Sequence, residues 1–415
     1  MTERTKARVR TMATKTEILV PAGDRERFEA ALMYGADAIY LGAKSFGMRA
    51  NPANFGFEEL GEAVRAAHER GVKVYLTCNT LPSEDELPQL EDFLLSAKGA
   101  GVDALIVADL GVLSHAKRVV PDMEIHMSTQ TGIVNSAACN FLWEQGVKRA
   151  VLARELSLEE IKEIRKNIPC EMELEVFVHG AMCVSFSGRC LISAYMTDRD
   201  ANRGMCAQPC RWKYALMEEK RPGVYFPVEE DSDGTYFFNA KDMCMIDHLK
   251  EVIDAGVTSL KIEGRAKSSY YTAVTANAYK TAKLFIERGE AVPQWVKDEV
   301  YKCSHRQYCT GFFYGYEPPT QNYETAGYER EYDVVAVVDS CEDGRVYCTQ
   351  RNRFFPGDEV EILEPGKEPV KLRPEHILNE KGEEVEAVNH SMMKFSFADD
   401  RVYKSGAFIR KKADE

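Results

Sequence analysis

The sequence contains no apolar run long enough to cross a membrane. Its 415 residues have a mean hydropathy of -0.35, and the longest apolar stretches are only as long as β-strands. A transmembrane helix needs about 20 consecutive apolar residues. The basic N-terminal segment, residues 1–15, also lacks the apolar core of a signal peptide. These absences predict a cytoplasmic protein with no membrane partner.

Positive charge is scarce as well. Lysine and arginine number 53 against 66 acidic residues, which gives a net charge of -13. A protein that binds nucleic acid through bulk electrostatics is usually basic, so any RNA contact is expected from a local patch. Hydrophobic residues nevertheless make up 45% of the chain, enough for a packed core, and this excludes a disordered protein.

Three common catalytic motifs are missing. No G-x-G-x-x-G follows the first predicted strand, and neither H-E-x-x-H nor G-x-S-x-G occurs anywhere. The first absence argues against a dinucleotide-binding fold. The other two argue against the zinc peptidases and serine hydrolases that carry those motifs.

Short strand-like runs alternate with amphipathic helical patterns from Thr16 to about Ala266. The predicted strands are Glu17–Val20, Ala38–Leu41, Val74–Thr77, Ala104–Ala108, Glu124–Met127, Ala150–Ala153, Glu173–Val178 and Ser259–Ile262. One predicted helix, Leu158–Asn167, opens with a capping box formed by Ser157 and Glu160. About eight such units predict a TIM-like (β/α) barrel with its chemistry at the C-terminal ends of the strands. A doubly wound parallel sheet is the alternative.

Two regions depart from this alternation and divide the chain. Residues 181–215 form a cysteine-rich insertion, followed by a hairpin-like stretch around Asp233-Gly234. Short alternating strands near the C-terminus predict a small β-barrel. The predicted division is a disordered basic N-terminus (1–15), the barrel (16–290), a helical and aromatic connector (291–331) and the C-terminal β-barrel (332–411).

Four of the 12 cysteines are clustered in the insertion. They are Cys183, Cys190, Cys206 and Cys210, in the pattern C-x(6)-C-x(15)-C-x(3)-C. A cytosolic chain keeps its thiols reduced, so clustered cysteines indicate metal binding or catalysis. Zinc sites usually have two tight pairs, and here only the second pair is tight, which favours an iron–sulfur cluster. Structural zinc and free buried thiols are the alternatives.

Cys244, in the sequence K-D-M-C, is a further candidate ligand that could substitute for one of the four. Its other interpretation is a small buried hydrophobic residue. His179 lies four residues before Cys183, so a Cys/His nucleophile is possible in principle. A crowd of cysteines nevertheless suits a single activated thiolate poorly, and a hydrogen-bonded structural histidine is an equal interpretation.

Charged residues gather at the end of the last predicted barrel strand. Lys261, Glu263 and Arg265 lie there, and cations at a barrel mouth suit a carboxylate or phosphate. Taken singly, each of them is better explained by a helix cap or an ion pair. Together they mark a polar pocket.

Basic and aromatic residues interleave around the last two cysteines of the insertion. Arg203, Arg211 and Lys213 flank Trp212, a composition that suits a splayed RNA base and its phosphates. A solvated surface loop is the plain alternative. The sequence therefore gives a candidate RNA-binding patch.

Longer segments of the chain resemble a known family. These segments are LVPAGDRERFEAALMYGADAIYLG, LARELSLEEI, EVFVHGAMCVSFSGRCLIS, NRGMCAQPCRWKY and SLKIEGRAKSSYY. They are similar to the collagenase-like peptidases, the thirty-second peptidase family of unassigned catalytic type. The C-terminal β-region resembles that family's accessory barrel, so the likeness covers nearly the whole chain.

The resemblance is greatest to family members that help form 5-hydroxyuridine at the wobble position of bacterial tRNA. It implies an oxygen-independent tRNA hydroxylase with a 4Fe–4S cluster and with prephenate as the small-molecule hydroxyl donor. It places the cluster on the four clustered cysteines, whereas ubiquinone-pathway relatives place one ligand at Cys244. We expect catalytic roles for His179, Lys261, Glu263 and Arg265, and tRNA and a sister protein of the same family as partners.

Two other functions remain open at this point. One is a peptidase, as the family's name says, with His179 and Cys183 as its dyad. The other is a non-enzymatic scaffold that binds RNA or a modifying protein through the C-terminal barrel.

Overall fold

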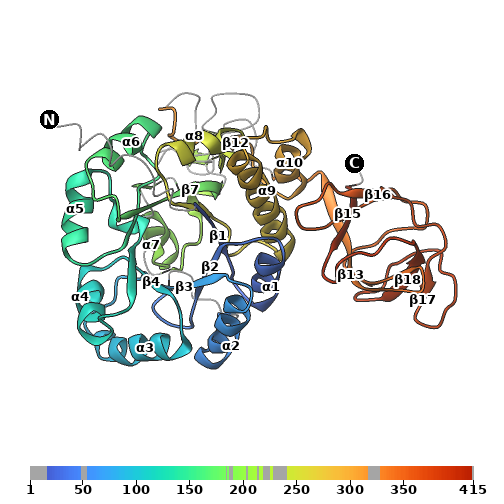
Figure 1. Ribbon diagram of the computed structural model, residues 1–415, viewed down its shortest axis with the longest axis horizontal. Coiled ribbons are helices and arrows are strands. Elements are labelled where there is room, and N and C mark those ends of the chain that lie inside the picture. Colours follow the sequence, from blue (N-terminus) through green and yellow to red (C-terminus); the bar gives the residue numbers. More distant parts are fainter. Residues whose placement is uncertain are drawn as a thin grey trace.

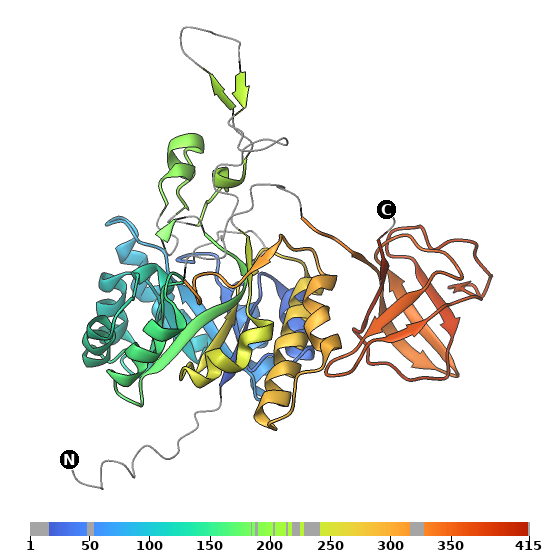
Figure 2. The same ribbon diagram turned by 90° about the horizontal axis from the view of Figure 1, so that it is seen from above.

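The computed structural model describes two domains that lie side by side, a barrel and a C-terminal sheet domain (Figures 1 and 2). The described residues are 16–47, 54–183, 185–186, 190–201, 204–212, 215–217, 225–227, 241–315 and 328–413. The predicted N-terminal segment 1–15 and the hairpin around Asp233-Gly234 lie outside them. Among the described helices, none has both the length and the apolar character of a membrane span.

Eight parallel strands form a closed barrel, which confirms the predicted TIM-like fold. They are β1 (Glu17–Pro21), β2 (Ala38–Gly42), β3 (Lys73–Cys78), β4 (Ala104–Val107), β5 (Glu124–Met127), β6 (Arg149–Val151), β7 (Glu173–Ala181) and β11 (Ser259–Ile262). Each pairs with the next in chain order, and β11 closes the ring by pairing with both β7 and β1. Closure pairs each of these eight strands with a neighbour on both sides.

Helices surround the barrel as Figure 1 shows. They are α1 (Arg25–Met33), α2 (Phe57–His68), α3 (Leu87–Ala100), α4 (Leu110–Val119), α5 (Ser136–Glu144), α6 (Leu158–Lys166), α8 (Leu249–Asp254) and α9 (Ser269–Glu287). The capping box predicted for α6 is present, because the Ser157 hydroxyl and the Glu160 carboxylate satisfy each other's backbone N–H groups. The apolar faces of the helices and strands meet in one large core.

Two short strands extend the sheet beyond the barrel. β10 (Asp242–Cys244) pairs antiparallel with the end of β7, and β12 (Tyr308–Cys309) pairs with β10. The cysteine-rich insertion leaves β7 at its C-terminal end and contains α7 (Ile192–Thr197) and the 3-10 turn η5 (Pro209–Arg211). Figure 2 shows α7 and the small hairpin of β8 (Ala215–Met217) and β9 (Tyr225–Pro227) projecting from one side of the barrel.

The C-terminal domain is a seven-stranded antiparallel sheet rolled around its own core. Its strands are β13 (Tyr332–Glu342), β14 (Arg345–Gln350), β15 (Val360–Leu363), β16 (Val370–Leu372), β17 (Leu378–Asn379), β18 (Lys394–Ala398) and β19 (Phe408–Lys412). β13 and β14 are joined by Asp343-Gly344, both with positive φ, the backbone that a tight hairpin turn requires. Phe354, Phe395 and Phe397 lie in the core of this domain.

The two domains are joined by a buried ionic and apolar contact. The guanidinium of Arg410 on β19 is fully buried and bonds to Glu299, which ends α10 (Gln294–Glu299), and to Glu361 on β15. Phe408, also on β19, belongs to the barrel's core. The hydroxyl of Tyr34 accepts a hydrogen bond from the Phe408 N–H at 3.3 Å. The position of the C-terminal domain relative to the barrel is therefore fixed by contacts that water does not reach.

Candidate active site at the barrel mouth

The interior of the barrel is polar at the N-terminal ends of its strands. Glu17, Arg149 and Glu173 are the first residues of β1, β6 and β7, and the Arg149 guanidinium bonds to both carboxylates. It also contacts Glu175, one step further into β7, at 3.1 Å. We call these residues, together with Lys261 on β11, the floor cluster. Each charge in this cluster has an oppositely charged partner.

Lys261, the member of the floor cluster on β11, is held by Glu175. The ammonium nitrogen of Lys261 is 2.6 Å from a Glu175 carboxylate oxygen, and Glu175 is fully buried. Burial alone raises a carboxyl pKa, but the charges of Lys261 and Arg149 outweigh it and lower the pKa of Glu175 to about 2. Lys261 also lies 4.6 Å from the ring centre of Tyr40 and 5.3 Å from that of Phe177. The lysine is thus a buried cation held between a carboxylate and two aromatic rings.

Arg154, which follows β6, lies at the C-terminal end of the barrel. Its guanidinium carbon is 3.7 Å from the Phe177 ring centre, and it donates to the carbonyl of Ala181 at 2.8 Å. It is also paired with Glu263 at 3.1 Å. Its Nε is buried and has no hydrogen-bond partner among the described residues. A buried donor without a partner is costly, so Arg154 is suited to receive an anionic ligand.

Arg265 reaches the same opening from the segment after β11. Its guanidinium donates to the hydroxyl of Thr77 on β3 at 3.1 Å and is nearly buried. It passes so close to Gly42 that a Cβ there would lie 2.7 Å from the guanidinium nitrogen. Glycine at the end of β2 therefore leaves room for this arginine. We call Thr77, Arg154, Phe177, Glu263 and Arg265 the mouth cluster.

The cysteine-rich insertion begins beside the mouth cluster. Cys183 is two residues beyond β7, and the Arg154 guanidinium donates to the carbonyl of Ala181, the last residue of that strand, at 2.8 Å. Burial of the sulfur raises the pKa of Cys183, and the thiols of Cys190 and Cys206 add to the increase. Cys190 is only 8% exposed. The charges of the Cys190 and Cys206 thiols thus act on Cys183, and the use of these cysteines as cluster ligands stays a prediction.

The second half of the insertion is tied back to the first. The N–H of Ala207 donates to the Ser193 hydroxyl at 3.0 Å, and the 3-10 turn that carries Cys210 packs against α7. The Cys206 sulfur accepts the backbone N–H of Gln208 at 3.3 Å. Free thiols, with a backbone N–H donor to the Cys206 sulfur, are a donor set that fits an iron–sulfur cluster.

Cys244 lies in a different environment. Its sulfur is 3.8 Å from the Tyr279 hydroxyl and interacts with Asp247 and Cys309. Burial raises its pKa to about 12. Its strand partner on β7 is His179, four residues before the first cysteine of the insertion. Among the described residues, the side-chain interactions of Cys244 are all with groups outside the ring of barrel strands.

His179 faces away from the mouth cluster. Its ring is 1% exposed and lies among the rings of Tyr271, Tyr279 and Tyr308, at centroid distances of 5.9, 5.4 and 5.3 Å. Burial, with the nearby charges of His305 and Lys267, lowers the pKa of His179 to about 3. No contact with Cys183 is found among the described residues. A neutral, enclosed imidazole here has the environment of a structural histidine.

The predicted RNA-binding residues are only partly described. Trp212 is 42% exposed at the end of the insertion's 3-10 turn. Arg203 and Lys213 lie outside the described residues, as does the side chain of Arg211. Tyr195 on α7 is 83% exposed, so two aromatic rings of the insertion face solvent.

Sequence reasoning missed Glu175, Arg149 and Phe177. Glu173, Glu175 and Phe177 alternate with aliphatic residues along β7, and this period of two places all three on the inner face of the barrel. A glutamate at the centre of a strand that is otherwise buried was the signal that could have identified the floor cluster.

Two family models match this chain. The one described as Peptidase family U32 matches residues 23–323, and the one described as Peptidase family U32 C-terminal domain matches residues 330–410. Together they span both domains, which confirms the resemblance seen in the sequence.

Similar proteins carry names from RNA modification. The chain is 36% identical over 416 residues to the tRNA hydroxylation protein P1 of Bacillus subtilis (strain 168), with 95% of each chain covered. It is 35% identical over 412 residues to the tRNA hydroxylation protein P of Escherichia coli (strain K12), covering 89% of this chain and 90% of that one. It is 38% identical over 278 residues to the 23S rRNA 5-hydroxycytidine C2501 synthase of the same organism, covering 66% and 41%. The chain is a member of peptidase family U32.

Proposed function

We propose that this protein is a tRNA hydroxylase that converts the wobble uridine to 5-hydroxyuridine. The names of its relatives support tRNA hydroxylation as its activity. The observation that carries the proposal is the position of Arg154, which pairs with Glu263 of the mouth cluster and donates to the carbonyl of Ala181, where the insertion that carries Cys183 begins. In this proposal, the anion site at Arg154 and the cluster held by the insertion's thiols lie next to each other at one barrel mouth.

The hydroxyl donor in this proposal is prephenate, a ring compound with two carboxylates. Arg154 lies over the ring of Phe177, Lys261 lies near the rings of Tyr40 and Phe177, and Arg265, bonded to Thr77, supplies a third cation. A carboxylate matches the fork of a guanidinium, and the ring of the donor would lie against the aromatic side chains. Arg154 has an unused buried donor for this purpose.

Cys183, Cys190, Cys206 and Cys210 would hold a 4Fe–4S cluster. When bound, such a cluster supplies one-electron chemistry. The chain's own residues do the remaining work. The mouth cluster binds and orients the anion, and the walls of the barrel exclude water from it. The exposed rings of Tyr195 and Trp212 lie where a splayed uridine could stack.

The test is nucleoside mass spectrometry of tRNA from a deletion strain that expresses variants of the chain. We expect Cys190→Ser and Arg154→Gln to abolish the modified uridine, while anoxically purified Arg154→Gln retains iron and sulfide. Cys170→Ser is the matched control, because Cys170 is an exposed thiol that precedes β7, whereas the insertion follows the other end of that strand. Normal modification in the Cys190→Ser strain would overturn the cluster's role. Unmodified tRNA in the Cys170→Ser strain would show that the effect is not specific to the insertion.

A peptidase reaction finds less support in this geometry. The enclosed ring of His179 has tyrosine partners and a pKa of about 3, whereas a general base needs a pKa near the working pH. Gelatin cleavage by metal-free protein, lost in Cys183→Ser, would nevertheless make the peptidase the better explanation.

A further inference from the structure

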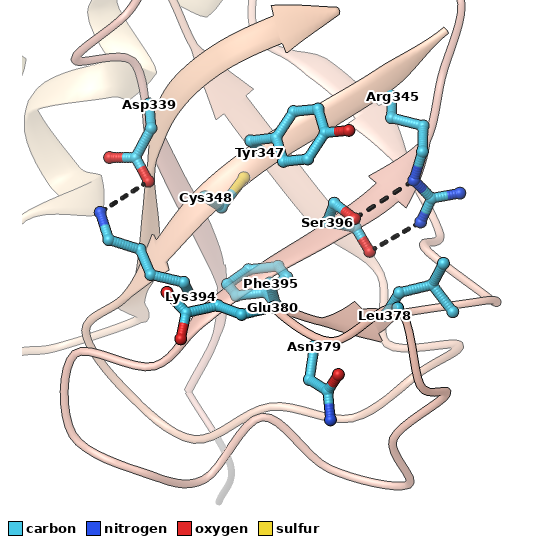
Figure 3. A pocket seen from close by; sticks show the side chains of 11 residues that line it. Asp339, Arg345, Tyr347, Cys348, Leu378, Asn379, Glu380, Lys394, Phe395 and Ser396 are labelled. Atoms are coloured by element: carbon cyan, nitrogen blue, oxygen red, sulfur yellow. Dashed lines mark hydrogen bonds and ion pairs between the residues drawn. The ribbon is translucent and has the colours of Figure 1, made fainter. Parts of the chain in front are cut away.

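The C-terminal domain has a groove that the proposed reaction does not use. It has a volume of about 550 Å³ and is lined by residues of β14, β17 and β18, with Asp339 of β13 at one end. Figure 3 shows the side chains around it.

The residues along β14 and its neighbour β18 leave the groove open to solvent. Along β14, Val346 and Cys348 are buried in the domain's core, so Arg345 and Tyr347 are on the outer face. Tyr347 is 39% exposed, and its partner across the ladder is Ser396. Arg345 faces Ala398 in the same way. Small residues opposite a large aromatic residue leave its ring open to a ligand.

The charge of the groove is positive at one end only. Arg345 donates from Nε to the Ser396 hydroxyl at 3.2 Å and from Nη2 to the Ser396 carbonyl at 3.1 Å. Its Nη1 has no partner among the described residues. Lys394 is paired with Asp339 at 3.1 Å. In Figure 3, Glu380 lies beside Lys394 and away from Arg345. Arg345 is thus the cation available to a ligand.

We propose that this groove binds an unpaired nucleotide of the RNA substrate. The base stacks on the ring of Tyr347, and the adjoining phosphate accepts a hydrogen bond from Nη1 of Arg345. An aromatic ring on an open sheet face beside an arginine is the arrangement that takes single-stranded nucleotides without regard to their identity. The inference rests on the proposed function, because that function makes RNA the substrate.

The buried contact between the two domains links this groove to the barrel mouth. Arg410 and its buried carboxylate partners hold the sheet domain at a fixed distance from the barrel mouth. A nucleotide bound at Tyr347 would therefore orient the remainder of the tRNA, and the uridine at the mouth would gain affinity without additional contacts there.

The experiment uses the full chain and a fluorescein-labelled, unmodified tRNA transcript with uridine at the first anticodon position. Affinity is measured by anisotropy over a range of salt concentrations. We expect Tyr347→Ala to weaken binding roughly 5- to 150-fold, the range set by the loss of one base stack, and Tyr347→Phe to bind like the wild type. Arg345→Gln should reduce the slope of log affinity against log salt by roughly 0.7–0.9, the value for one phosphate contact.

Phe355→Ala is the matched control. Phe355 is also 39% exposed in this domain and has an arginine, Arg353, 4.7 Å from its ring, but it does not line the groove. Wild-type affinity in both Tyr347→Ala and Arg345→Gln would refute nucleotide binding in the groove while leaving the proposed function intact. A wild-type chain that binds no tRNA would overturn both. Equal losses in Phe355→Ala and Tyr347→Ala would also overturn the groove, because the effect would not be specific to it.

Discussion

The two ends of the barrel contain similar residues but use them differently. At the floor, Arg149 is surrounded by the carboxylates of Glu17, Glu173 and Glu175, and it is 2% exposed. At the mouth, Arg154 has one carboxylate partner among the described residues, an aromatic ring beside it, and a buried donor that none of those residues satisfies. At the floor, Arg149 and its carboxylates neutralise one another among the described residues, and their contribution is to the stability of the fold. The mouth is incomplete, and a ligand would complete it.

The largest effect on stability is expected at the floor. Glu175→Gln leaves Lys261 and Arg149 without their buried carboxylate, and breaking a buried ion pair in this way costs about 3–5 kcal/mol. Urea unfolding followed by circular dichroism measures the loss. Glu159→Gln, at an exposed position on α6, is the control and should keep the wild-type midpoint. An unchanged midpoint for Glu175→Gln would contradict the structural role of the floor.

The floor should also make stability depend on pH. His126 is fully buried on β5, and burial together with the charge of Arg149 lowers its pKa well below 6.5. The folded state therefore keeps this imidazole neutral, while the unfolded state takes up a proton as the pH falls below 6.5. Stability is lost in that direction, by about 1.4 kcal/mol per pH unit for each such histidine.

Between pH 6.5 and 5, His126→Gln should remove one histidine's contribution to the dependence of unfolding free energy on pH. Unfolding at several pH values measures this dependence. His179, with its pKa of about 3, contributes to the slope with the same sign. His390→Gln, at an exposed position, is the control. A slope that does not change in His126→Gln would mean that this imidazole is protonated in the folded protein.

At the mouth, stability and activity should separate. Arg154→Met removes one partly buried ion pair and keeps an apolar side chain over Phe177, so we expect a stability loss of about 1–2 kcal/mol. Formation of the modified nucleoside should fall roughly a hundredfold, the usual effect of removing one preorganised donor from an active site. If Arg154→Met lost as much stability as Glu175→Gln and kept its activity, the two ends of the barrel would not differ as proposed.

The smallest effect on stability is expected on the insertion. Tyr195 is 83% exposed, so Tyr195→Ala should unfold at the wild-type urea concentration. It should still weaken binding of the tRNA transcript roughly 5- to 150-fold if the ring stacks on a base. Tyr195→Phe is the control for the ring itself. Wild-type affinity in Tyr195→Ala would remove this residue from the RNA surface.

Much of the fold could be predicted from local sequence. The strand at Ser259–Ile262 and the helix start at Ser157 were placed correctly, because glycine turns, apolar runs and capping residues act over a few neighbouring positions. The alternation along β7 also determined that Glu175 and Phe177 share a face. Which face would lie inside the barrel was not contained in any local pattern.

Closure of the sheet decided the rest. The ladder between β7 and β11 shifts register between Lys261 and Ile262, and beyond this irregularity His179 lies among the tyrosines of α9 and β12. The pairing of β10 with the end of β7 likewise brought Cys244 to the outer side of the wall. The sequence by itself determined the elements and the four clustered cysteines. Only the tertiary structure decided which polar groups meet, because opposite charges on strands far apart in the chain become partners only when the barrel closes around them.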